Sequence, residues 1–332
     1  MVRLASVALL TLVVACARER GPIGETTWSI PGFVLHGRVA STGETLVLHE
    51  MGVGARLGVV SRAGELRWEA SYAREPLIST IAQNGDVYVL VDTLSALVLE
   101  RRARVDGTTL WSKTLPRADA RFGALVLDRE DVVWLVFNDD GPTDLGGGPF
   151  GEPRAFTARY GRFAASDGAY LSSGVLPFVM TEPERAASVP TGGIVVSTVG
   201  PLAVIDRDGR PRFTPNRTRG FAMHEDGTIS AASCIGRRCG IVRFDANLVA
   251  QRVLDVPCGG AVTPLLGGAF VVAGSASLGE QGNVIGCIAH VDAGDAVELE
   301  TLDAVFLDLL PGDPYAGYRM RHDGTLVARE LP

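Results

Sequence analysis

The chain has 332 residues, of which 46% are hydrophobic and 21% are charged, so it is long enough to bury a large core. Its formal net charge is −7, which excludes an extensive nucleic-acid surface because phosphate binding requires clustered lysine and arginine. The 40 glycines and 18 prolines show no collagen-like period and separate many short apolar runs, a pattern that predicts an all-β fold.

The first residues have the pattern of an export signal. Arg3 precedes an apolar stretch over residues 4–15, which is too short to cross a bilayer and typical of a secretory signal peptide. The stretch ends in "VVAC", and this ending resembles the lipobox of bacterial lipoproteins. An ordinary signal peptide, in which Cys16 is incidental, is the alternative.

The lipobox resemblance implies a membrane anchor. Residues 1–15 would be removed as a lipoprotein signal peptide, and residues 16–25 would form the lipidated Cys16 and a short polar tether. Two or three acyl chains hold a protein on a membrane far more firmly than one. The resemblance therefore implies a location in the cell envelope, and Ala17 after the lipidated cysteine favours the outer membrane.

Residues 26–332 contain a repeated phrase that ends a hairpin turn and starts a strand. It is clearest in "SRAGELRWEAS" and "RVDGTTLWSKT", where Gly64 and Gly107 are 43 residues apart, as are Trp68 and Trp111. Weaker copies follow at Gly168, Gly209, Asn247, Gly294 and Gly324. Asparagine suits the glycine position because it is the next-best residue at positive φ.

A second family of turns alternates with the first, and each of its members precedes an apolar run typical of a strand. These turns lie at Gly43, Gly85, Glu130, Gly192, Gly227 and Gly268. Each unit of about 40 residues therefore holds two such turns and about four strands, the pattern of a β-propeller.

The repeats predict seven four-stranded blades, with six or eight as alternatives. Six units end near Tyr72, Leu115, Leu176, Pro215, Leu254 and Thr301. The remaining C-terminal residues suffice for only three strands. "TTWSIPG" at residues 26–32 resembles "TTLWSKTLP" at residues 108–116, which is a unit's last strand. We therefore expect this N-terminal strand to complete the last blade and close the ring, which removes an exposed sheet edge.

The Gly-x-x-x-Trp phrase and its period resemble the repeats of the pyrroloquinoline-quinone-like superfamily and related exported bacterial propellers. "TDLGGGPFGEPRAFTARY" is similar to a phrase found in the exported group. Quinone-dependent dehydrogenases of this superfamily carry a vicinal Cys–Cys pair and calcium ligands, and no Cys–Cys pair occurs in this sequence. The resemblance therefore implies a fold, and we expect no cofactor.

Four cysteines remain after Cys16, at positions that lack the paired CxxC spacing of most structural zinc sites. They are Cys234, Cys239, Cys258 and Cys287. Disulfides persist in exported proteins, so we predict Cys234–Cys239 and Cys258–Cys287 bridges. Free thiols, a single bridge and a zinc site are the alternatives.

One unit is longer than the others. Gly107 and Gly168 are 61 residues apart, and the excess falls at residues 138–155, where glycines and prolines suit a loop projecting from the disc. Pro149 lacks an N–H and neither a helix nor a lysine follows, which excludes a phosphate-binding loop. Long insertions often carry contacts, so the candidate contact loop comprises Asp139, Asp140, Asp144, Gly146, Gly147, Gly148 and Phe150.

The three carboxylates of this loop, from Asp139, Asp140 and Asp144, are oxygen ligands that would suit calcium. Their spacing does not match an EF-hand, so we assign no metal. The sequence contains no catalytic motif, which indicates a protein that is not an enzyme. It predicts a lipid-anchored binding or scaffold module of the cell envelope for a protein or glycan partner. The alternative is an envelope enzyme, a hydrolase, lyase or quinoprotein-like protein, that uses the propeller channel.

Overall fold

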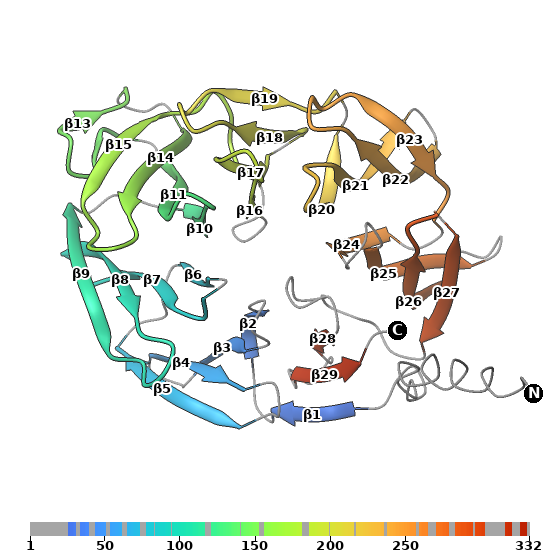
Figure 1. Ribbon diagram of the computed structural model, residues 1–332, viewed down its shortest axis with the longest axis horizontal. Helices are drawn as coiled ribbons and strands as arrows, with labels where there is room; N and C mark the ends of the chain where they lie inside the picture. The colour runs from blue at the N-terminus through green and yellow to red at the C-terminus, as the bar shows by residue number, and fades with distance from the viewer. Residues whose placement is uncertain are drawn as a thin grey trace, which may run out of the picture.

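The computed structural model of the chain is a ring of small antiparallel β-sheets (Figure 1). It describes residues 26–30, 34–39, 44–50, 54–61, 65–73, 78–82, 84–93, 95–116, 121–139, 141–152, 156–180, 186–198, 200–215, 217–235, 238–256, 259–264, 270–278, 283–294, 296–302, 316–320 and 326–330. These ranges contain no helix, and hence none that is long and apolar enough to cross a membrane.

Six four-stranded sheets follow one another along the chain as blades 1 to 6. Blade 1 contains β2 (Val34–Val39), β3 (Thr45–Glu50), β4 (Ala55–Val60) and β5 (Leu66–Tyr72). Blade 2 contains β6 (Ile78–Ile81), β7 (Val87–Asp92), β8 (Ala96–Arg102) and β9 (Thr109–Pro116). Blade 3 contains β10 (Arg121–Leu127), β11 (Val132–Asp139), β14 (Thr157–Ala164) and β15 (Tyr170–Val175).

The second half of the ring repeats this order. Blade 4 contains β16 (Ala186–Ser188), β17 (Ile194–Ser197), β18 (Leu202–Ile205) and β19 (Pro211–Phe213). Blade 5 contains β20 (Thr218–Met223), β21 (Ile229–Ile235), β22 (Arg238–Phe244) and β23 (Ala250–Leu254). Blade 6 contains β24 (Gly259–Pro264), β25 (Phe270–Leu278), β26 (Asn283–Val291) and β27 (Val297–Leu302). In blade 7 the described strands are β28 (Ala316–Met320), β29 (Leu326–Glu330) and β1 (Thr26–Ile30).

The N-terminal strand closes the ring, as the sequence predicts. Strand β1 pairs antiparallel with β29, placing Ser29 opposite Val327 and Ile30 opposite Leu326 (Figure 1). The six four-stranded sheets and the three-stranded sheet of blade 7 confirm the predicted β-propeller with seven blades. The predicted ends of the six units lie within two residues of the ends of β5, β9, β15, β19, β23 and β27.

The antiparallel order gives the disc two different faces. The first strand of each of blades 1 to 6 lies next to the ring axis, and the fourth lies at the rim (Figure 1). The turns between first and second strands and between third and fourth strands therefore lie on one face, here called the turn face. The turns between second and third strands, together with the connections between blades, lie on the opposite face, here called the loop face.

The core consists of apolar layers between adjacent blades. In β11, Val133, Leu135 and Phe137 pack in a cluster with side chains of blade 2. The alternate residues Trp134 and Val136 pack with side chains of blade 4. A strand covered on both sides needs apolar residues at every position, which explains the continuous apolar run of β11.

Two turns place the left-handed residue one position later than the sequence alignment does. Asp131 has φ 57°, in place of Glu130, and Leu248 has φ 65°, in place of Asn247. Aspartate tolerates this conformation because its short side chain can hydrogen-bond locally. Leucine at positive φ costs about 1–3 kcal/mol. Leu248 is nevertheless buried in the core between blades 4 and 5, and that burial offsets the strain.

The repeated Gly-x-x-x-Trp phrase forms a contact between neighbouring blades. The indole N–H of Trp68 donates to the carbonyl oxygen of Arg104 in blade 2 at 3.0 Å, and the ring covers Gly107. A Cβ atom on Gly107 would lie 2.6 Å from the Trp68 ring. The tryptophan of one blade thus requires the glycine of the next blade, which is why both recur with the same period.

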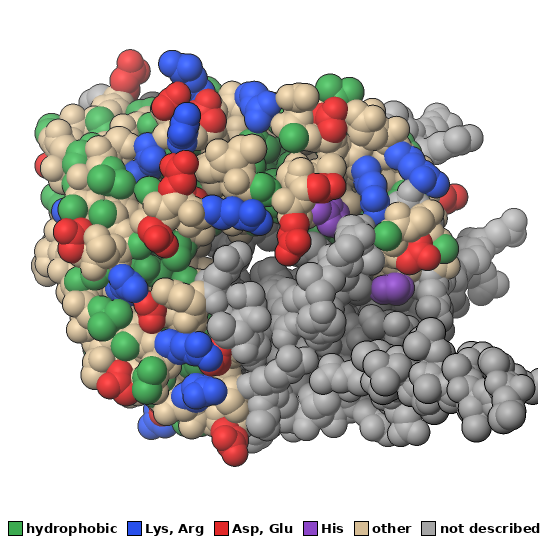
Figure 2. Space-filling model, viewed as in Figure 1, with side chains coloured by type: hydrophobic (Ala, Val, Ile, Leu, Met, Phe, Trp, Pro, Cys, Tyr) green, Lys and Arg blue, Asp and Glu red, His purple; other side chains and the backbone are tan. Residues whose placement is uncertain are grey.

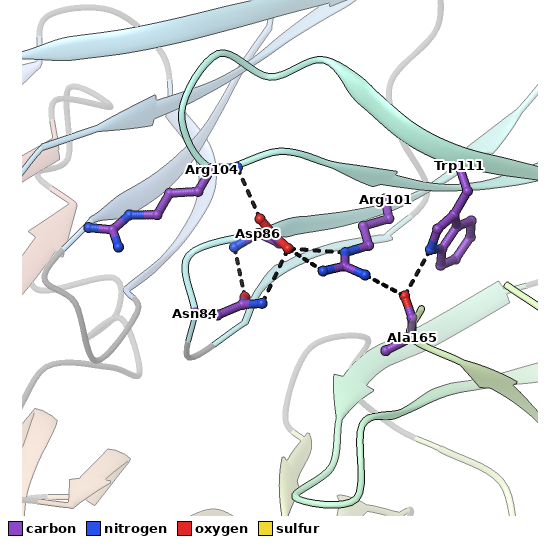
Figure 3. Close-up of polar contacts among 6 residues, drawn as sticks. All are labelled: Asn84, Asp86, Arg101, Arg104, Trp111 and Ala165. Carbon is purple, nitrogen blue, oxygen red and sulfur yellow. Dashed lines mark hydrogen bonds and ion pairs between the residues drawn. The ribbon is translucent and has the colours of Figure 1, made fainter. Parts of the chain in front are cut away.

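The second junction repeats this contact and adds an ion pair (Figure 3). Trp111 donates to the carbonyl oxygen of Ala165 at 2.9 Å, and Arg101 donates to the same oxygen at 2.6 Å. The Arg101 guanidinium also binds Asp86, with a shortest distance of 2.6 Å. Because most of both ionic side chains is shielded from solvent, this pair is stronger than an exposed surface pair.

We predict that Gly107→Ala and Gly168→Ala destabilise the propeller more than Gly227→Ala does. All three glycines have positive φ, so each alanine carries a similar backbone strain. Only at positions 107 and 168 would the new methyl group overlap a tryptophan ring, at 2.6 and 2.9 Å. Overlap of this kind costs about 1–3 kcal/mol. Urea unfolding followed by tryptophan fluorescence would measure the difference, and equal midpoints for the three variants would disprove the interlocking role.

Candidate functional site

The extra length of blade 3 forms a small hairpin on the loop face. Strand β11 ends at Asp139 and β14 begins at Thr157. Between them, β12 (Thr143–Asp144) pairs with β13 (Pro149–Phe150). Residues 141–152 are called the insertion hairpin below. The sequence analysis predicts the additional residues of the long unit in this same segment.

The insertion hairpin folds against the ring and does not project as a free loop. Leu145 is fully buried in the cluster between blades 2 and 3. Gly147 lies so close to Tyr170 of β15 that a Cβ atom would be 2.2 Å from the phenol oxygen. The expectation of a projecting loop is therefore corrected, because one leucine and the missing side chain of Gly147 allow the hairpin to pack on the blade.

Two of the carboxylates predicted as contact or calcium-binding groups accept hydrogen bonds from residues of the insertion hairpin. Asp144 accepts N–H groups of Gly146 and Gly148 at 2.7 and 3.0 Å. Asp139 is buried and accepts the hydroxyl of Thr143. Asp140 lies outside the described residues. In the described ranges, no cluster of three or more His, Cys, Asp or Glu side chains is placed to hold a metal.

An arginine that the sequence analysis did not identify lies beneath the insertion hairpin. Arg159 of β14 is fully buried, and its Nε is 3.7 Å from an oxygen of Asp139. Phe150 of the hairpin lies beside the guanidinium, with 5.9 Å between the guanidinium carbon and the ring centroid. Gly151 approaches so closely that a Cβ would fall 1.6 Å from Nη1. The sequence feature that could have revealed this arginine is the alternation of side chains along a strand. Alternation puts Arg159 on the same face of β14 as Phe163.

The end of β11 also fixes the connection between blades 3 and 4. The buried Asn138 amide donates to the carbonyl oxygen of Met180 at 3.0 Å and accepts the N–H of Met180 at 2.9 Å. This double contact orders part of the segment between β15 and β16. Blade 3 therefore presents two fixed segments on the loop face.

Phenylalanines are exposed beside these segments. Phe156 and Phe213 are 42% and 39% exposed. Phe178 packs edge-on against Phe213, with ring centroids 5.8 Å apart. Phe156 lies two residues before Ala158, whose N–H donates to the carbonyl oxygen of Phe178. Phe156, Phe178 and Phe213 are called the aromatic patch below. Clusters of exposed apolar side chains on a soluble protein often mark interaction sites.

Charged side chains of both signs are intermingled over the described part of the face shown in Figure 2. Binding to nucleic acid requires a continuous basic surface, because each neutralised phosphate needs its own lysine or arginine. The described part of this face therefore shows no continuous basic surface.

The backbone register bears on the first predicted disulfide. Cys234 and Cys239 are directly opposite each other in the hairpin of β21 and β22, next to the closing pair Ile235 and Arg238. In a hairpin with a two-residue loop, the second pair from the loop is not hydrogen-bonded, and its Cα atoms are about 4.5 Å apart. That separation is within the range of disulfides. The register favours this bridge, which stays a prediction.

The second predicted bridge involves Cys258, which lies outside the described residues. Its proposed partner Cys287 lies in β26. The Cys258–Cys287 bridge therefore stays a prediction.

His224, a buried histidine, lies at the turn face of blade 5. Its Nε2 is 2.8 Å from the hydroxyl oxygen of Ser230, and both side chains are buried. The ring of His224 packs edge-on against Phe270 of blade 6, with centroids 6.2 Å apart. Burial and the nearby charge of Arg243 lower the pKa of His224, and Asp226 opposes them. Because the Ser230 hydroxyl is inaccessible, this pair is a packing contact and not a nucleophile with its base.

Comparison with solved structures shows the fold. The WD40 domain of Pan2 from Neurospora crassa has a TM-score of 0.62 and 11% sequence identity, covering 91% of this chain and 90% of that one. The Dos1 propeller has a TM-score of 0.53 and 9% identity, covering 92% of this chain and 94% of that one. BamB from Moraxella catarrhalis has a TM-score of 0.45 and 13% identity, covering 90% of this chain and 84% of that one.

No protein-family model and no curated protein sequence matches the chain. At identities of 11% and 9%, the matches to the Pan2 WD40 domain and the Dos1 propeller establish the β-propeller fold alone. The role of the protein must therefore be inferred from its own surface.

We predict that the free energy of unfolding decreases as the pH falls below about 6.5. The pKa of His224 lies below its ordinary value of 6.5 in the folded protein, so the unfolded chain takes up a proton at higher pH than the folded chain does. One such proton changes stability by at most about 1.4 kcal/mol per pH unit. Urea unfolding between pH 7.5 and 4.5 would measure the slope.

The matched variants for this test are His224→Gln and His290→Gln. The first removes the titrating group and should flatten the pH dependence in this window. The second removes a partly exposed histidine of blade 6 and should leave the wild-type slope. An unchanged slope in His224→Gln would show that other groups cause the acid sensitivity.

Proposed function

We propose that this propeller is a lipid-anchored binding or scaffold module of the cell envelope and that the loop face of blade 3 contacts its partner. The observation that carries this proposal is the insertion hairpin. It adds an ordered segment to one blade, is fixed by the buried Leu145, and leaves Pro149 and Glu152 exposed. A rigid insertion loses little conformational entropy when it binds, which favours affinity.

The aromatic patch favours a protein over a glycan as the partner. Phe156 and Phe213 expose large apolar rings on the same end of the sheets as the hairpin. Aromatic side chains are enriched in the centres of protein interfaces, where burial of a ring contributes strongly to binding. A glycan partner is an outcome that the experiment below distinguishes.

The lipid anchor rests on the sequence of the first 16 residues, which lie outside the described residues. Strand β1 begins at Thr26, so about ten residues would separate the lipidated Cys16 from the rim of blade 7. A tether of that length spans at most about 35 Å. The anchor would therefore hold the disc close to the membrane surface.

We expect a photo-crosslinking amino acid at Pro149 or Glu152 to capture a discrete partner in intact cells. Both positions lie on the exposed side of the insertion hairpin. The same group at Asp106 or Asp208, which are exposed in turns of the opposite face, is the matched control and should not give that product. Denaturing gels followed by mass spectrometry would identify a protein partner, and a glycosidase-sensitive product would identify a glycan.

Substitutions in the aromatic patch refine this experiment. Phe213→Ser should lower the crosslinking yield from position 149 at least several-fold, because a buried aromatic contact contributes about 2 kcal/mol or more at an interface. Val105→Ser is the control, since Val105 is 78% exposed in a turn-face hairpin. Crosslinks of equal yield from both faces, or from the turn face alone, would contradict the proposed contact surface.

For the anchor, we expect a clickable palmitate analogue to label the wild-type protein but not Cys16→Ser. The wild-type protein should sediment with membranes, and Cys16→Ser should not, because the thiol that carries the lipid is absent. Cys234→Ser keeps Cys16 and should remain labelled. Persistent labelling of Cys16→Ser would refute lipidation at this cysteine without affecting the crosslinking result.

A further inference from the structure

The direction of β1 determines from which face of the disc the chain continues toward its N-terminus. Strand β1 forms the rim of blade 7 (Figure 1), and residues 31–33 join its end at Ile30 to the start of β2 at Val34. As the first strand of blade 1, β2 starts at the loop face. A link of this length reaches at most about 14 Å, whereas β2 is about 20 Å long. The end of β1 therefore lies at the loop face, and its start at Thr26 lies at the turn face.

The proposed lipid anchor would be attached to this turn-face end of β1, and the inference that follows rests on the lipidation of Cys16. About ten residues separate Cys16 from Thr26, so the tether reaches at most about 35 Å. From the turn face the tether extends directly to the membrane. If the loop face touched the membrane, the tether would first have to pass along the height of a blade, about 20 Å. The position of the tether thus favours the turn face as the face next to the membrane.

Exposed aliphatic side chains recur on the turn face. Leu66, Leu110 and Leu171 lie at the starts of the fourth strands of blades 1, 2 and 3, and they are 58%, 50% and 47% exposed. Val105 and Val249 lie in turns between third and fourth strands, and they are 78% and 56% exposed. These five residues, called the aliphatic rim below, belong to four different blades. A bilayer surface is broad enough to contact all of them at once.

Charged groups on the same face limit how deeply it can enter a membrane. Asp106 and Asp226 are exposed in turns of this face, where each accepts the N–H and the hydroxyl of a threonine two residues later. Transfer of a carboxylate into hydrocarbon is costly, so contact is restricted to the headgroup level. Each aliphatic side chain adds little there. The tether makes their contact intramolecular, however, so that several weak contacts are sufficient.

We propose that the turn face rests on the bilayer that holds the lipid of Cys16. The aliphatic rim contacts the boundary between headgroups and acyl chains, and the charged turns remain in water among the headgroups. The loop face, with the insertion hairpin and the aromatic patch, then points away from the membrane. In this orientation the surface proposed to bind a protein partner is accessible from the aqueous phase.

The full-length lipidated protein, reconstituted into phosphatidylcholine vesicles that contain an alkyne-tagged phosphatidylcholine, would test this orientation. A photo-crosslinking amino acid in place of Leu171 should attach to the tagged lipid at least fivefold more than the same group in place of Val175. These positions are matched, because they lie near opposite ends of β15 and are 47% and 46% exposed. Val249 and Val253, which are 56% and 47% exposed, give the same comparison in blade 5. In-gel fluorescence after reaction with an azide dye measures the lipid adduct.

Variants with altered surface residues separate this proposal from the lipid anchor itself. Val105→Asp combined with Leu110→Asp should lower the lipid adduct from position 171 at least threefold, and the protein should still sediment with the vesicles because Cys16 is intact. Val175→Asp is the matched control and should leave the adduct unchanged. A protein that sediments but gives equal adducts from positions 171 and 175, more from 175, or none from either would overturn the orientation and leave the anchor in place. Failure of the wild-type protein to sediment would overturn both.

Discussion

The first three blade junctions depend on a contact in which an aromatic side chain of one blade packs on a glycine of the next. A propeller blade is a small sheet with two apolar faces, and it is stable only when both faces are covered. Trp68 and Trp111 fix the distance and angle to the next blade. Each indole N–H donates to one backbone carbonyl oxygen of that blade, and each ring packs on one of its glycines. At the third junction the phenol end of Tyr160, from the third strand of blade 3, lies against Gly209. Small variations in blade length are tolerated because this contact sets the spacing between blades.

The sequence predicts those parts of the fold that rest on repeated local rules. Glycines at positive φ and the alternation of apolar residues recur along the ring, and tryptophans accompany them in blades 1 and 2, so the blade count and the closing strand β1 follow from comparison of the units. The two errors in turn alignment have a physical cause. Residue type ranks asparagine above leucine at positive φ, whereas the fold places Leu248 there because its side chain fills the core.

The candidate site was less predictable because it depends on contacts between segments with no repeat to compare. A single leucine among glycines and prolines fits an exposed loop as well as a packed hairpin, and only the tertiary structure shows Leu145 in the core. Arg159 was overlooked for a related reason. An arginine within a strand usually points to solvent, and its burial here results from the hairpin that covers it. Comparison of the unit lengths predicts where the insertion lies, but it does not predict which contacts the residues of the insertion make.

The pairing of β1 with β29 has a consequence for how the protein reaches its folded state. Blade 7 joins the N-terminal strand of the ring to its last strands, and β1 and β29 are separated by nearly 300 residues. Contacts between such distant segments form late, because the loop that joins them must first be closed. Six blades can assemble in order as the chain emerges, but the ring stays open, with an unpaired edge at β29, until both ends are present. Removal of β1 or of β29 therefore has an effect beyond the missing residues, because the strand pairing that closes the ring is lost.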